Sequence, residues 1–270
     1  MALSVKSQRD RPAVAIRLGV VFAAVTVWWL VLYHGVDAVV GDEYTRGGHV
    51  VRAVGATLFT VPLIYAARRF LDRQPWSGLG WSSVGRGGRA FLFGAACWGI
   101  PALLSMALML WLGWADLTLR TSLPEVFAPL LGLVVLVLLY EAVPEELIFR
   151  GYFFTNLAEQ WSTGITVVAQ AALFTGWGVL IGAAGAIDRV VLFFAFSLVL
   201  GAIRATTGNL LACMGFHAMF QVTSQFLASK WNYIDLDDPD MAVVGLAFVV
   251  IPFATTAIVL WLLARKRRPD

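Results

Sequence analysis

The stretch LYEAVPEELIFRGYF, residues 139–153, decides how the rest of this chain is interpreted. It places Glu141, Glu145, Glu146 and Arg150 within ten residues, between two strongly apolar runs. The chain of 270 residues is 59% apolar and 14% charged, whereas an ordinary soluble domain is roughly 25% charged. Most of the chain is therefore suited to the hydrocarbon core of a membrane, and the presence of four charged residues in this stretch requires an explanation.

Eight apolar runs are long enough to cross a membrane. A bilayer core is about 30 Å thick and takes about 20 apolar residues per helix. We expect the helices near residues 14–36, 50–67, 90–113, 126–157, 164–186, 189–204, 208–228 and 242–264. The sequence thus predicts an all-α polytopic membrane protein with eight transmembrane helices. Pro144 lies inside the fourth helix and predicts a bend, because an interior proline normally kinks a helix.

The basic residues indicate the orientation of these helices. If the N-terminus is cytoplasmic, the Arg and Lys clusters all fall on the inner side: Lys6, Arg9, Arg11, Arg68, Arg69, Arg73, Arg86, Arg89, Arg150, Arg204 and the tail ARKRR. The opposite connections are mostly acidic, as in NYIDLDDPD at 232–240. The positive-inside rule therefore predicts that both termini are cytoplasmic. This sidedness explains the net charge of +3, so we expect no nucleic-acid partner.

The expected organisation has three regions. Residues 1–120 form a three-helix membrane region, 121–228 form the core that carries the charged stretch, and 229–270 hold an outer acidic loop, the last helix and a basic tail. No convincing small-residue cleavage site follows the first basic stretch, so we expect the first helix to be retained. The many Arg and few Lys residues suit a GC-rich bacterial genome, which favours a multi-pass protein of a bacterial inner or plasma membrane.

The charged stretch predicts a reactive carboxylate. A charge at the bilayer centre costs about 2.5 to 3.5 kcal/mol, so it must be compensated. Glu146 and Arg150 are four apart, with the acid first, which favours an ion pair. Glu145 is offset by about 100° and is left to face a cavity, where it can act as a general base. Two alternatives stay open: a helix end at the membrane surface, or a transporter's proton relay that includes Glu141.

The seventh apolar run, TGNLLACMGFHAMFQVTSQF, supplies possible partners. His217 and Gln221 are four apart and share a helix face. Beside a water-activating carboxylate, both could stabilise an oxyanion, although a lone buried histidine is often a packing residue. A zinc site needs three or four ligands, and His34 and His49 are expected at the other ends of the first two helices. We therefore expect no cofactor and disfavour a metal. Cys97 and Cys213 are interpreted as small core residues.

These residues resemble a known family. EELIFRG, residues 145–151, resembles the E-E-x-x-x-R signature of the CAAX-processing and bacteriocin-processing (CPBP) intramembrane endopeptidases, which include the type II CAAX prenyl endopeptidases. RATTGNLLACMGFHAMFQ, residues 204–221, is similar to the later motif, in which a TG turn leads to H-x-x-x-N. The resemblance covers residues 121–228. It implies hydrolysis of a peptide bond in a membrane-associated peptide or protein, without a covalent intermediate.

The same resemblance implies roles for five residues. Glu145 would activate water, Glu146 and Arg150 would hold the site together, and His217 and Gln221 would polarise the scissile carbonyl. Gln221 departs from the family's Asn by one methylene.

A larger departure is on the expected fifth helix. The family's motif there is F-x-x-x-H, and the aligned stretch in this chain is FTGWG, so Gly178 stands in place of the histidine. Losing the base's partner would cost about 10² to 10⁴ in rate. Trp177, Thr175 or water is expected to fill the space, and Trp177 cannot act as a base because its N–H only donates. The sequence thus predicts an intramembrane endopeptidase or, alternatively, a catalytically impaired relative acting as a binding, immunity or scaffold protein.

Overall fold

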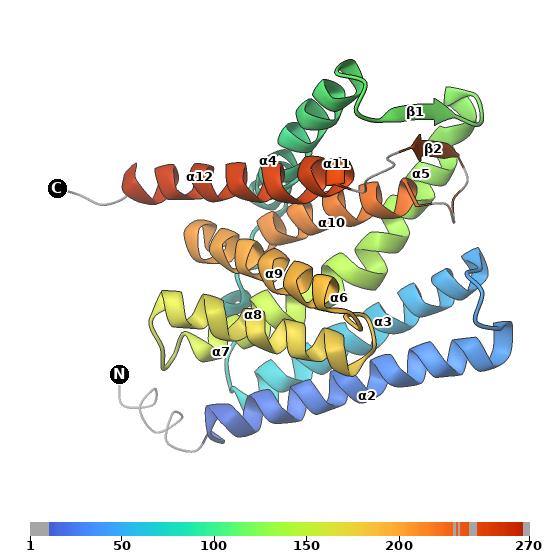
Figure 1. Ribbon diagram of the computed structural model, residues 1–270. Coiled ribbons are helices and arrows are strands. Elements are labelled where there is room, and N and C mark those ends of the chain that lie inside the picture. Colours follow the sequence, from blue (N-terminus) through green and yellow to red (C-terminus); the bar gives the residue numbers. More distant parts are fainter. Residues whose placement is uncertain (1–10, 229–230, 232, 238–241, 267–270) are drawn as a thin grey trace.

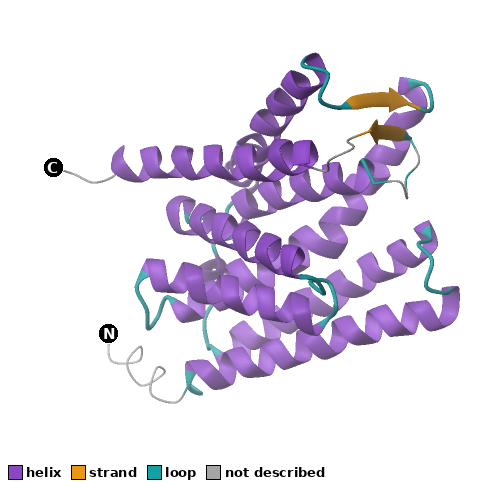
Figure 2. Ribbon diagram, viewed as in Figure 1, coloured by secondary structure: helices purple, strands orange, loops and turns teal. Residues whose placement is uncertain are grey.

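The computed structural model describes residues 11–228, 231, 233–237 and 242–266, and the structural statements that follow refer to this part of the chain. The predicted basic residues Lys6 and Arg9, and the tail beyond Lys266, lie outside it. The described chain is a bundle of helices with two short strands at one end (Figures 1 and 2).

The elements follow the order of the predicted helices. They are α2 (Val14–Val40), α3 (Arg46–Ala66) with the π-helical turn η1 (Ala67–Leu71), the 3₁₀ turn η2 (Trp76–Leu79), α4 (Val84–Trp111), β1 (Asp116–Leu119), α5 (Leu123–Val137), η3 (Leu138–Ala142), α6 (Val143–Glu146), η4 (Leu147–Phe153), α7 (Phe154–Leu157), α8 (Thr163–Leu180), α9 (Ile187–Thr207), α10 (Leu210–Phe226), β2 (Ile234–Asp237), α11 (Ala242–Gly245), η5 (Leu246–Val250) and α12 (Ile251–Lys266).

The all-α prediction is confirmed, and each of the eight predicted segments contains a helix. In the described residues, seven helices are long and apolar enough to cross a membrane, which indicates a multi-pass membrane protein. The remaining one, α10, has only 17 residues. α2 begins and α12 ends at the same end of the bundle, on the left in Figure 1. The number of crossings and the cytoplasmic placement of the termini stay predictions.

The fourth predicted helix continues through Pro144, and the bend expected there stays a prediction. Residues Leu123–Leu157 form one helix of 35 residues, in which the π-helical segments η3 and η4 flank the short α6. Pro144 lies in the first turn of α6, directly after η3, so the wider π turn takes up the irregularity that proline introduces. Such π-helical stretches are frequent at functional sites, and this pair encloses both Glu145 and Glu146.

The fifth predicted helix ends earlier than expected. α8 stops at Leu180, and Gly182 follows with φ +80°. Glycine adopts this left-handed conformation without strain, and it commonly ends helices. The early end leaves a short turn between α8 and α9 instead of one more helical turn.

Helices α4 and α10 pack with their backbones in contact. A Cβ atom on Gly94 would lie 1.8 Å from the carbonyl oxygen of Ala212, and one on Gly215 would lie 2.0 Å from that of Phe91. Small residues allow such close approach between membrane helices. The two glycines therefore fix how deeply α10, which carries His217, is inserted into the bundle.

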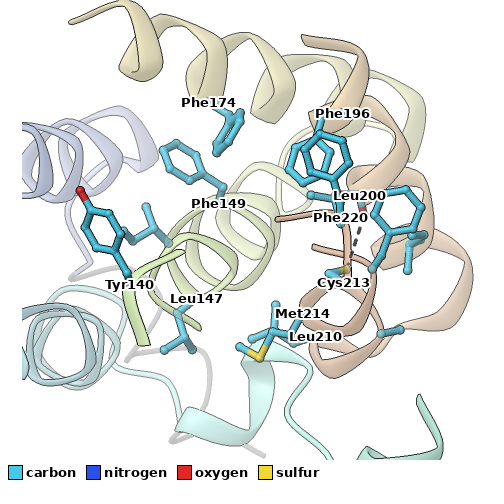
Figure 3. Close-up of a cluster of buried hydrophobic side chains, with 14 of the residues drawn as sticks. Tyr140, Leu147, Phe149, Phe174, Phe196, Leu200, Leu210, Cys213, Met214 and Phe220 are labelled. Atoms are coloured by element: carbon cyan, nitrogen blue, oxygen red, sulfur yellow. Dashed lines mark hydrogen bonds between the residues drawn. The ribbon is translucent and has the colours of Figure 1, made fainter. Parts of the chain in front are cut away.

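Cys213 is fully buried on α10, and its Sγ donates a weak hydrogen bond to the carbonyl oxygen of Leu200 at 3.4 Å (Figure 3). Cys97 is half-buried, and both cysteines are free thiols. The prediction that they are core residues is confirmed for Cys213 and only in part for Cys97.

The end of the bundle where α2 begins is held by a buried carboxylate. Asp72 accepts hydrogen bonds from Arg17 at 2.9 Å and Arg68 at 2.8 Å, and from Tyr152 at 3.0 Å and Asn156 at 3.1 Å. These donors come from α2, η1, η4 and α7. Arg68, interpreted from the sequence as a topology signal only, is thus also part of a buried network.

At the opposite end, β1 and β2 form a small antiparallel sheet, from Asp116 opposite Asp237 to Leu119 opposite Ile234. An ion pair between Arg120 and Asp235 extends it. The sequence predicted only acidic connections here. The sheet joins the segment after α4 to the segment after α10.

Candidate active site

Helix α10 presents a polar stripe to the charged stretch. His217 and Gln225 lie eight residues apart on α10, and Gln221 lies between them. His217 Nδ1 is 2.8 Å from Glu146 Oε1, while Gln225 Nε2 donates to both carboxylate oxygens of Glu141 at 2.8 and 2.9 Å. The order of these contacts shows that the two helices run antiparallel along the site.

Glu146 is the carboxylate that holds the centre of the site. Its Oε1 accepts from Arg150 Nη1 at 3.1 Å and lies 2.8 Å from His217 Nδ1. All three side chains are buried. The ion pair expected between Glu146 and Arg150 is therefore present, and the bond to His217 is an addition that the sequence did not predict.

Arg150 is fixed by two further helices. Its Nη2 donates to Ser197 Oγ on α9 at 2.8 Å, and its guanidinium lies over the ring of Phe174 on α8, 4.7 Å from the centroid. Gln170 in turn donates to the carbonyl oxygen of Ser197 at 2.9 Å. Arg150 is thus held rigidly by partners on three helices, and it holds Glu146 in the same way.

The TG turn sets the start of α10. Gly208 ends α9 with φ +68°, and its N–H donates to the carbonyl oxygen of Arg204 at 2.9 Å. Asn209 caps α10, because its side chain accepts from Leu211 N at 2.9 Å; asparagine is a preferred N-cap. Arg204 donates to the carbonyl oxygen of Arg150 at 3.0 Å. The turn is therefore tied to the charged stretch, and it brings His217 level with Glu145, as expected.

Glu145 faces a cavity of about 150 Å³. Its side chain is 12% exposed, and its Oε2 lies 3.9 Å from His217 Nε2. Phe174, Phe196 and Phe220, whose side chains are labelled in Figure 3, form part of the cavity wall. Polar groups also line the cavity: Tyr33, Tyr140, Glu141, Arg189, His217 and Gln221. The expectation that Glu145, rather than Glu146, is left to face a cavity agrees with this geometry.

A second, larger hollow adjoins this cavity. It has a volume of about 430 Å³ and shares Tyr33, Tyr140, Glu141 and Gln221 with the smaller one. Its other lining residues include Tyr44 and Trp231, which lie toward the end with the strands. The two hollows therefore share part of their walls.

The position of Gly178 is filled by Phe193 of α9. A Cβ atom on Gly178 would lie 2.6 Å from Cδ1 of the Phe193 ring, and that ring stacks on Phe174 with centroids 5.4 Å apart. Thr175 Oγ1 donates to the carbonyl oxygen of Ala171 within its own helix. The expectation that Trp177, Thr175 or water would fill this space is therefore wrong. An aromatic ring on the facing helix does so.

Gln221 lines the cavity beside His217 and Glu145. All five predicted site residues are therefore joined, either by hydrogen bonds to Glu146 or by a shared cavity wall. Sequence reasoning missed Ser197 and Gln170, which support Arg150, and Gln225, which binds Glu141. Gln225 could have been found, because it extends the spacing of His217 and Gln221 by one more turn. In the described residues, no group of three or more His, Cys, Asp or Glu side chains is arranged to hold a metal ion.

Comparison with known proteins agrees with the resemblance seen in the sequence. Residues 126–223 match the family model described as Type II CAAX prenyl endopeptidase Rce1-like. The match contains all five predicted site residues and Gly178. No curated protein and no solved structure matches the chain. Residues 126–223 therefore form a domain of the Rce1-like type II CAAX prenyl endopeptidase family.

Proposed function

We propose that this protein is an intramembrane endopeptidase that cleaves a membrane-associated peptide or protein with water activated by Glu145. The observation that carries the proposal is the different environment of the two adjacent glutamates. Glu146 is fully buried and bonded to Arg150 and His217. Glu145 is partly exposed and lines the cavity. A carboxylate that faces a small cavity with several aromatic side chains in its wall suits a general base.

The proposed site consists of Glu145, Glu146, Arg150, His217 and Gln221. Glu145 takes a proton from water, and the resulting hydroxide attacks the carbonyl carbon of the peptide bond. Glu146 and Arg150 hold the site in place. The side-chain amide of Gln221 faces the same cavity and donates to the carbonyl oxygen as negative charge develops on it.

This proposal is tested by comparing protein termini in membranes from cells that carry the native protein or Glu145→Gln at equal abundance. The comparison covers every membrane protein at once, so the substrate need not be identified beforehand. We expect new peptide termini with the native protein only, because the amide keeps the shape of Glu145 but cannot take a proton. Glu125→Gln is the matched control, since Glu125 is exposed in the first turn of α5, away from the cavity. Identical termini in all three samples would refute the proposal.

A second candidate function is favoured by Phe193. Residue 178 is glycine where the family has its fifth-helix histidine, and the ring of Phe193 occupies the space that a side chain there would need. The chain would then bind a membrane partner without cleaving it. In that case Glu145→Gln leaves the cellular phenotype intact, whereas a change that disrupts helix packing, such as Gly215→Leu, removes it.

A further inference from the structure

The two ring nitrogens of His217 have different neighbours. Nδ1 lies 2.8 Å from Glu146 Oε1, which also accepts from Arg150 at 3.1 Å. A carboxylate paired with arginine is ionised and only accepts hydrogen bonds. The proton in the bond between Glu146 and His217 therefore resides on Nδ1, and the tautomer of His217 is set by Glu146.

With the proton on Nδ1, a neutral imidazole has a lone pair on Nε2 and accepts hydrogen bonds there. Nε2 lies 3.9 Å from Glu145 Oε2, which is too far for a direct hydrogen bond. Both atoms belong to residues that line the cavity. Two acceptors separated in this way are suited to a water molecule that donates one O–H to each.

We propose that His217 Nε2 and Glu145 together hold and deprotonate the attacking water, so that His217 does the work of the missing fifth-helix histidine. The inference rests on the proposed endopeptidase function, and it differs from the carbonyl-polarising role that the family resemblance implies for His217. Gln221 remains the donor to the carbonyl oxygen.

The proposed step balances without any co-reactant. The water oxygen bonds to the carbonyl carbon as one of its protons passes to the pair formed by Glu145 and His217. The C–N bond then breaks, and that proton passes to the leaving nitrogen, which gives a carboxylic acid and an amine. The pair returns to its starting protonation state.

The surroundings of His217 support this role in two ways. First, Glu146 is held by Arg150, and Arg150 by Ser197, so the imidazole is oriented by a rigid carboxylate, as in other carboxylate–histidine pairs that serve as bases. Second, of the cavity's lining residues in the described part of the chain, His217 is the single histidine. Phe193 occupies the space at Gly178, the position at which the family resemblance places a second one.

His217→Gln separates the two possible roles. A glutamine side chain still offers N–H donors to a carbonyl oxygen, but it cannot hold a transferred proton. If His217 is a base partner, kcat should fall by about 10² to 10⁴ while KM changes little. If His217 only donates to the carbonyl, the amide should preserve most of the turnover.

A second set of variants tests whether the histidines are interchangeable. Gly178→His combined with Phe193→Ala restores a histidine to the fifth helix and removes the ring that would collide with it. We expect this pair of changes to raise the turnover of His217→Gln at least tenfold, because a base partner is present again; a residue with a merely structural role would not be replaced in this way.

The measurement is made on purified protein in phospholipid vesicles, with a synthetic peptide spanning the bond that the comparison of termini identifies. Native-like turnover in His217→Gln, or a triple variant no faster than His217→Gln at equal thermal stability, overturns the inference. Glu145→Gln is measured beside them. If native protein and Glu145→Gln cut the peptide equally, or neither cuts it, the proposed function fails; if only His217→Gln behaves unexpectedly, the function stands and the inference alone is wrong.

Discussion

Adjacent residues in this chain lie in different surroundings, and Glu145 and Glu146 are the clearest case. Glu146 compensates the buried charge of Arg150, whereas Glu145 makes no comparable ion pair in the described structure and faces a cavity. Removing one partner of a buried ion pair leaves the other charge uncompensated, at a cost of about 3 to 5 kcal/mol.

We therefore predict that Glu146→Gln lowers the free energy of unfolding by about 3 kcal/mol or more. Glu145→Gln should change it by less than about 1 kcal/mol. Thermal unfolding of the two variants and the native protein in the same detergent makes the comparison. Equal destabilisation by both substitutions would show that the two carboxylates do not differ in this way.

For individual residues, the sequence predicted some contacts and could not predict others. The spacing of Glu146 and Arg150 predicted their ion pair, because both lie on one helix and helical geometry is local. The contacts of His217 with Glu146, and of Phe193 with the space at Gly178, join different helices. Their partners depend on how the helices pack, which no local spacing reveals.

Among the elements, the crossing of α4 and α10 sets the position of His217. The two backbones meet at Gly94 and Gly215, where any Cβ atom would overlap a carbonyl group of the other helix. Since backbone atoms cannot move aside as a side chain can, even one methyl group should separate the helices.

We predict that Gly215→Ala lowers the free energy of unfolding by about 3 kcal/mol or more. This is at or beyond the upper end of the usual cost of overpacking a core. Gly132→Ala is the matched control, since Gly132 also lies in a membrane helix and a Cβ atom there meets nothing within 4 Å. Unfolding temperatures of the two purified variants give the answer. A Gly215→Ala protein as stable as Gly132→Ala would mean that the helices are not in backbone contact.

The buried Asp72 network gives a second prediction for the elements. Asp72→Ala removes the carboxylate that accepts hydrogen bonds from Arg17, Arg68, Tyr152 and Asn156. The two buried arginines then lose the negative charge of Asp72. We expect a loss of about 3 to 5 kcal/mol, seen as reduced abundance in the membrane and a lower unfolding temperature. Glu43→Ala, on the exposed turn between α2 and α3, should have little effect. Comparable abundance of both variants would argue against the network.

The order of the helices could be read from hydropathy because each run of apolar residues is a local signal. The predicted ends of the helices were less accurate. The fifth helix was expected to reach residue 186, but α8 ends at Leu180, because Gly182 takes up a left-handed conformation. The pairing of β1 with β2 joins segments more than a hundred residues apart, so it could not be predicted from either segment alone. The network around Asp72 escaped prediction for the same reason.

For the whole molecule, the open prediction is its orientation in the membrane. Thr118 in β1 and Ser77 in η2 are exposed near opposite ends of α4. In a background without Cys97 and Cys213, a membrane-impermeant thiol reagent added to intact cells should label Thr118→Cys and not Ser77→Cys. Labelling of Ser77→Cys alone would reverse the predicted orientation, with the termini outside.

That orientation bears on the proposed function because the larger hollow, which shares wall residues with the cavity at Glu145, lies toward the end with the strands. If β1 and β2 face outward, we expect water to enter the site from the non-cytoplasmic side.

Glutamate-dependent cleavage without the fifth-helix histidine is tested most directly with purified protein in phospholipid vesicles. Native protein and Glu145→Gln are each incubated with a peptide that spans the bond found by the comparison of termini, and the products are identified by mass. We expect the native protein to cut that bond and Glu145→Gln to leave the peptide intact at the same protein concentration. Equal cleavage by both proteins, or none by the native protein, would contradict the proposal.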